Sequence, residues 1–172
     1  GARVTTLEAG KKYMIYNTTF NGGTSRTGFI KNTGTELGHS GSSIKPASFK
    51  TTDEGYIWTV EVVNAENGEY YLKASNGKYA SAKTTSTTST TGQLIYIQDF
   101  ATSTCTKDAA AMTSCSSENA DGTTTVWKDL VANSGVFTIS GTKSGNTNKG
   151  CWNGNSGSFA LWSNAHPYAF YE

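Results

Sequence analysis

The run Tyr56-Ile57-Trp58-Thr59-Val60 leads through the pair Asn67-Gly68 into Tyr70-Tyr71-Leu72-Lys73. Aromatic and β-branched residues favour strands, whereas Asn and Gly favour tight turns. The stretch therefore predicts two strands joined by a turn. The same arrangement returns further along the chain, and internal repeats of this kind must be recognised first because they decide the architecture.

A second copy begins at Thr125-Val126-Trp127-Lys128-Asp129-Leu130 and leads through Ser134-Gly135 into Val136-Phe137-Thr138-Ile139. A third begins at Tyr168-Ala169-Phe170-Tyr171, with no second strand after it in this sequence. If the three copies are equivalent, Trp58, Trp127 and Phe170 occupy matching positions. Three units of short strands predict a closed barrel with threefold pseudosymmetry.

The 172 residues fit one domain, which we expect to span residues 1–172 with repeats at about 10–63, 64–132 and 133–172. The expected fold is an all-β β-trefoil of twelve strands, six closing a short barrel and six capping it as hairpins. A two-sheet β-sandwich is the alternative, because strands of similar length also build that fold.

Helical periodicity is nearly absent, and the strand-like runs are short. Asn76-Gly77 is the strongest hairpin-turn signal, and Asn153-Gly154 and Asn21-Gly22 have the same composition. The run 84–91 contains only Ser and Thr and is typical of a loop. The twelve expected strands cover residues 13–16, 28–31, 48–51, 56–63, 69–74, 78–82, 93–98, 124–131, 136–140, 150–153, 158–162 and 168–171.

Charge and composition argue against several classes of function. The net charge is +1, so the chain has no basic field for nucleic acid or anionic lipid, and no apolar run is long enough for a membrane span. The acidic residues are scattered, and no nucleophile or phosphate-binding motif is present, which argues against an enzyme.

The three cysteines, none in a CxxC pair, and two histidines do not predict a zinc site, and the acids are too isolated for calcium. We therefore expect neither metal nor cofactor. Cys105 and Cys115 bracket a polar loop and either form a small disulfide or remain two thiols. Cys151, next to Trp152, is expected to be a small buried residue.

The segment from Asn64 to Ser81 carries an Asn-Gly pair, a strand, the Asn76-Gly77-Lys78 turn and a strand of small residues. With Trp58 and Trp127 each preceding such a strand, it resembles the ricin B-type β-trefoil lectins. The Gln-x-Trp motif of that family is absent, because Tyr56 and Thr125 stand two positions before these tryptophans. The resemblance implies a lectin-like domain of a secreted or cell-surface protein, such as a bacterial carbohydrate-active enzyme.

Sugars bind by stacking their C–H face on an aromatic ring while polar side chains satisfy their hydroxyl groups as donors and acceptors. The third repeat gathers such groups, and its shortness should leave a pocket open. By strand alternation Trp152 and Asn153 face opposite ways, so both cannot be core. The candidate ligand-binding residues are Trp152, Asn153, Asn155, Trp162, Asn164, His166 and Tyr168.

The sequence thus predicts a non-catalytic, monomeric carbohydrate-binding module whose partner is an oligosaccharide or polysaccharide. A protein-binding trefoil such as a protease inhibitor, presenting the loop between Cys105 and Cys115, is the alternative. Asp53, Tyr56, Asn76, Lys78, Tyr79, Tyr96 and Asp99 are weaker candidates for sugar contacts in the first two repeats.

Overall fold

The computed structural model describes residues 3–17, 28–40, 46, 48–80, 88–103, 105, 116–118, 124–126, 135–141, 151–156, 158–162 and 167–172. For residues 116–118, 124–126, 151–156 and 158–162 it describes the backbone alone. All regular elements in these ranges are strands or single turns of 3-10 helix, so the protein belongs to the all-β class.

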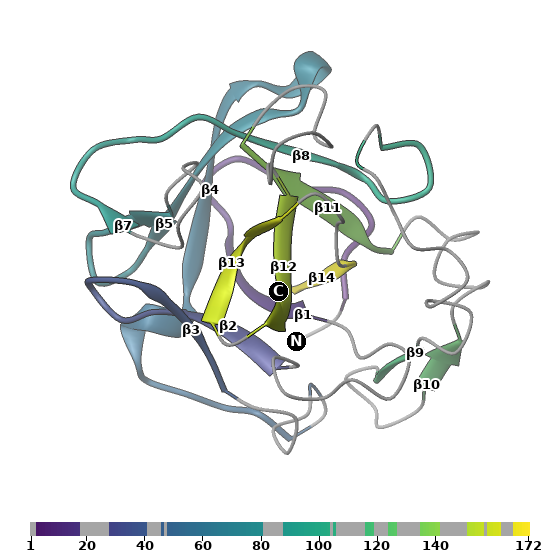
Figure 1. Ribbon diagram of the computed structural model, residues 1–172, viewed down its shortest axis with the longest axis horizontal. Coiled ribbons are helices and arrows are strands. Elements are labelled where there is room, and N and C mark those ends of the chain that lie inside the picture. The colour runs from purple at the N-terminus through teal and green to yellow at the C-terminus, as the bar shows by residue number, and fades with distance from the viewer. Residues whose placement is uncertain are drawn as a thin grey trace.

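Six strands form a closed barrel (Figure 1). Each pairs antiparallel with the next around the ring, and the last pairs back onto the first, so no barrel strand is left as an edge. This closure excludes the two-sheet sandwich. In ring order the strands are β1 (Lys12–Asn17), β4 (Trp58–Asn64), β5 (Glu69–Ala74), β8 (Ile95–Asp99), β11 (Phe137–Ser140) and β14 (Tyr168–Tyr171).

Three hairpins lie between successive barrel strands along the chain. Hairpin β2–β3 (Gly28–Asn32, Leu37–His39) separates β1 from β4, and β6–β7 (Tyr79–Ala80, Thr88–Ser89) separates β5 from β8. Hairpin β12–β13 (Cys151–Ser156, Ser158–Trp162) separates β11 from β14 and crosses the front of the barrel in Figure 1. The order barrel strand, hairpin, barrel strand is thus used three times.

The second of these units ends earlier than the sequence repeats predicted. Its last barrel strand is β8, which pairs Ile95 with Tyr70 of β5 and Ile97 with Ile139 of β11. The expected strand 124–131 therefore has no place in the ring. Its described part, β10 (Thr124–Val126), instead pairs with β9 (Ser116–Glu118) in a separate two-stranded sheet. The predicted equivalence of this run with the Trp58 strand is wrong, and Trp127 itself lies outside the described residues.

The other strand predictions are confirmed to within a few residues, with one exception. Residues 48–51 form no strand. The partner of β2 is instead β3, reached through a turn in which Thr33 N–H donates to the Glu36 carbonyl and Gly34 has φ +96°. Asn153-Gly154 lies inside β12, at a shift in its register with β13, and is not the hairpin turn. Strand β7 lies within the expected loop 84–91.

The Asn76-Gly77 turn is confirmed and also joins two hairpins. Gly77 has φ +90°, and its N–H donates to the Ala74 carbonyl (2.9 Å). Asn76 Oδ1 accepts from Lys78 N–H (3.1 Å), while Nδ2 donates to the carbonyl of Asn32 at the end of β2 (2.9 Å). The buried Asn32 side chain returns a bond to the Lys78 carbonyl (3.2 Å). These amide bonds hold the first capping hairpin against the second unit.

The barrel interior is filled by alternate residues of the ring strands. Trp58, fully buried, is among the largest of them, and its Nε1–H donates to the Ile30 carbonyl (3.1 Å). A second cluster lies on the other face of β1 and β14. It is formed by Tyr16, Phe29, Ala169 and Tyr171, with Met14, Phe49 and Tyr56 packed against it. Strand β14 is consequently buried on both faces.

Gly68 and Gly77 provide a matched pair of substitutions. Both have positive φ, a region that costs an L-residue about 1–2 kcal/mol. A Cβ at Gly77 would meet nothing within 4 Å, whereas one at Gly68 would lie 2.9 Å from the Ile97 carbonyl oxygen. We expect Gly77→Ala to destabilise by about 1 kcal/mol and Gly68→Ala by about 1–3 kcal/mol more, because of the added steric overlap. Urea unfolding of both variants checks this, and equal losses would contradict it.

Candidate functional site

Four of the seven predicted ligand-binding residues lie in the third capping hairpin. Trp152, Asn153 and Asn155 belong to β12, and Trp162 is the last residue of β13. Asn164 and His166 lie outside the described residues. Tyr168 belongs to β14 and is fully buried in the barrel core, so its ring does not reach the surface where a sugar would stack.

The register of β12 and β13 separates the two tryptophans. Trp152 is opposite Leu161, and Trp162 is opposite Cys151 in the adjacent row of the ladder. Adjacent rows belong to opposite faces of a sheet. Trp162 therefore shares a face with Asn153, which is opposite Ala160, and Trp152 belongs to the other face. The register therefore assigns the two tryptophans to different faces of the hairpin.

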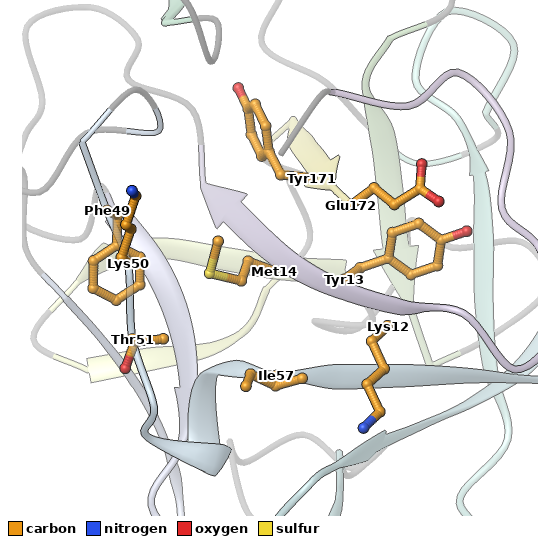
Figure 2. Close-up of a pocket in the computed structure, with 9 residues that line it drawn as sticks. All are labelled: Lys12, Tyr13, Met14, Phe49, Lys50, Thr51, Ile57, Tyr171 and Glu172. Atoms are coloured by element: carbon orange, nitrogen blue, oxygen red, sulfur yellow. The ribbon is translucent and has the colours of Figure 1, made fainter.

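A pocket of about 330 Å³ lies elsewhere, beside the joined strands β1 and β14 (Figure 2). Three separate parts of the chain meet there: β1, residues 49–51 and 57 from the connection into β4, and the end of β14. Its lining residues are Lys12, Tyr13, Met14, Phe49, Lys50, Thr51, Ile57, Tyr171 and Glu172.

The floor of the pocket is apolar and is supported by the second cluster. Met14 lies at its centre in Figure 2, with Phe49 to one side. The half-buried Phe49 ring stacks on Phe29, with centroids 4.7 Å apart and an interplanar angle of 22°. Tyr56 packs its edge against Phe49 at 5.2 Å. Phe49 is thus held on a rigid aromatic base, which lowers the entropy lost when a ligand packs against it.

The rim of the pocket supplies hydrogen-bond donors and acceptors. Lys12 and Lys50 are exposed, and Thr51 Oγ1 accepts from Asp53 N–H (2.9 Å), which leaves the hydroxyl hydrogen able to donate. The Glu172 carboxylate accepts from Lys11 Nζ at 2.7 Å, and Lys11 also pairs with Glu8 at 3.3 Å. Both contacts raise the pKa of Lys11, and the hydrogen bond to Glu172 contributes most.

An ion pair next to the pocket stabilises the turn that carries Tyr56, the residue packed against Phe49. Lys31 Nζ donates to Asp53 at 2.7 Å and lies 5.4 Å from the centre of the Tyr56 ring. Asp53 also caps the 3-10 turn η1 (Glu54–Tyr56) by accepting from Gly55 N–H. The bond from Lys31, followed by that from Gly55, holds the pKa of Asp53 below its usual range, and the same pair raises the pKa of Lys31.

The weaker candidates of the second unit are engaged in contacts within the protein. The Tyr79 hydroxyl donates to Glu61 (3.3 Å), and Lys73 Nζ lies 5.3 Å from the Tyr79 ring centre. Asp99 lines a separate cavity of about 220 Å³ together with Tyr70, whose pKa is raised by burial and then by the Asp99 charge. Asn76 and Lys78 form the turn described above, and Tyr96 pairs with Glu69 and Ser140 in the barrel.

Sequence reasoning missed most of the pocket. It placed Met14 and residues 49–51 in strands without assigning them to a site, and it gave no role to Lys12 or Glu172. Phe49 was detectable only as an apolar residue between polar neighbours, and Met14 only as one residue of a strand-like run, and both signals are too common to mark a site. Tyr171 was recognised as part of a strand, but its contribution to a pocket depends on which segments pack beside it.

Comparisons with models of protein families, with curated proteins and with solved structures found no match to this chain. Among the described residues, no helix is long and apolar enough to cross a membrane. The same residues hold no group of three His, Cys, Asp or Glu side chains that could bind a metal ion. Cys105 is buried, and Cys115 lies outside the described ranges, so the two alternatives of a disulfide and two thiols both stay predictions.

Proposed function

We propose that this chain is a β-trefoil domain that binds carbohydrate and has no catalytic activity. The trefoil assignment is supported by the order of the strands, since three successive units each contribute two strands to the closed barrel and one hairpin outside it. The resemblance to ricin B-type lectins points the same way. A fold of this kind hosts many functions, so the binding activity is argued from the site.

The pocket beside β1 and β14 carries the proposal. It combines an apolar floor containing Met14 and Phe49 with a rim that offers a hydroxyl, a carboxylate and two ammonium groups. A sugar needs this combination, because its C–H face packs on apolar surface while its hydroxyl groups require donors and acceptors. The site that we propose therefore lies at the junction of the first and third units, whereas the sequence located it in the third hairpin.

The affinity of the pocket for one sugar residue should be weak, at about 10⁻⁴ to 10⁻³ M. A shallow site exchanges the sugar's bonds to water for similar bonds to protein and gains little from the exchange. Repeated sugars on a polysaccharide, or neighbouring domains, would raise the effective affinity. We also propose that the protein is secreted or lies on the cell surface, because a carbohydrate-binding module is useful where polysaccharide is the partner.

The test is binding to an array of immobilised glycans, followed by NMR titration with the best ligand. We expect the wild-type protein to bind and the Phe49→Ala variant to lose binding while its circular dichroism spectrum stays native. The double variant Asn153→Ala/Asn155→Ala, in the hairpin, should retain binding. The reverse pattern would return the site to the hairpin. Absence of glycan binding would overturn the proposal, and inhibition of a protease panel would then favour a protein-binding trefoil.

A further inference from the structure

The distribution of charge around the pocket indicates which class of sugar it binds. Lys12 and Lys50 stand at opposite borders, with Met14 between them (Figure 2). Within the described residues, neither lysine takes part in an ion pair. The pocket's carboxylate, Glu172, is already bonded to Lys11. The rim therefore offers two ammonium groups whose charge no side chain of the described residues balances in an ion pair.

We propose that the pocket selects acidic sugars, in particular hexuronates, over neutral sugars of the same ring. This inference rests on the proposed function and specifies its ligand. A hexuronate keeps the C–H face that packs on Phe49 and Met14, and it replaces the neutral CH₂OH group by a carboxylate. Hydrogen bonds from an ammonium group to a carboxylate are shorter and stronger than those between neutral groups.

The selectivity is local and does not come from a field over the whole molecule. The chain has a net charge of +1, so a polyanion gains little attraction away from the pocket. Other cations near the site are already paired: Lys11 with Glu8 and Glu172, and Lys31 with Asp53. The carboxylate of an acidic sugar can therefore bond to Lys12 or to Lys50, according to the border that it faces, without competing against an ion pair within the described residues.

The size of the effect follows from the exposure of the two lysines. Exposed ion pairs contribute modestly, and hydrogen bonds to charged groups contribute somewhat more than neutral ones. We expect a hexuronate to bind about five- to tenfold more tightly than its neutral counterpart at low salt. The preference should fall as ionic strength rises, because the Debye length shortens to about 8 Å near 0.15 M salt.

The experiment is a pair of NMR titrations with oligomers of glucose and glucuronic acid, and a second pair with galactose and galacturonic acid. Each pair shares one ring configuration and differs by the carboxylate. Wild-type protein should prefer the acid in at least one pair. The double variant Lys12→Gln/Lys50→Gln should lose this preference but keep its affinity for the neutral sugar. The matched control Lys73→Gln, on the outer face of β5 away from the pocket, should behave like wild type.

The outcomes separate this inference from the proposed function. Equal binding of acid and neutral sugar, unchanged in the double variant, would overturn the acidic preference and leave carbohydrate binding in place. If the double variant keeps the preference for the acidic sugar, then Lys12 and Lys50 do not cause this preference and the inference is wrong. If no sugar binds, the proposed function fails and the inference fails with it.

Discussion

Replacing Trp58 by alanine should lower the free energy of unfolding by about 3–5 kcal/mol, the usual cost of truncating a large buried aromatic residue. Trp58 is fully buried in the core cluster, which residues of the ring strands and of the capping strand β2 form around it. The ring strands are closed on one another, so they cannot collapse into the cavity without breaking their register. Urea unfolding followed by far-ultraviolet circular dichroism provides the measurement.

Two control variants separate the contributions of Trp58. Trp58→Phe keeps most of the buried ring but removes the Nε1–H bond to the Ile30 carbonyl, which should cost about 1–3 kcal/mol. Val63→Ala, on the same strand but 46% exposed, should change stability by no more than about 0.5 kcal/mol. A loss below about 1 kcal/mol for Trp58→Ala would show that the barrel interior relaxes far more than a closed ring of paired strands allows.

Replacing Phe29 by alanine should destabilise the protein by a comparable amount, about 3–5 kcal/mol, and should also abolish sugar binding. Phe29 is fully buried outside the barrel. Its ring stacks on Phe49, and Tyr16 and Tyr171 pack against it at centroid distances of 5.1 and 6.1 Å. The variant thus removes the base on which the pocket floor rests, although Phe29 itself does not line the pocket.

Comparison with two other variants tests this account of Phe29. Phe49→Ala, at a half-buried position, should cost less stability than Phe29→Ala but lose binding equally. Phe29→Leu, which retains much of the buried volume, should restore most of the stability and part of the binding. Binding is measured by NMR titration at a temperature where each variant is folded. Full binding by a folded Phe29→Ala variant would show that Phe49 keeps its place without the ring beneath it.

The strands were predictable from the sequence because their signals are local. The strand predicted at residues 69–74 is β5, and its alternate residues Tyr70, Leu72 and Ala74 are buried, as expected for a strand with one face on the core. Asn76-Gly77 forms its turn because the positive φ that the turn requires is a property of the glycine itself. By contrast, residues 124–131 have the composition of a barrel strand. Nothing local shows that β8 already occupies that place in the ring.

The sequence by itself determined most of the strand-forming runs and the turn at Asn76-Gly77, because each depends on neighbours a few positions apart. Only the tertiary structure decided where the pocket proposed as the binding site lies. The pocket joins β1 to Phe49 and to Glu172 at the end of the chain, and such contacts arise only when the barrel closes. The register of the β12–β13 hairpin decided to which faces of the hairpin Trp152 and Trp162 belong. One residue of slip exchanges the two faces of a strand, so composition alone could not tell whether Trp152 and Trp162 share a surface.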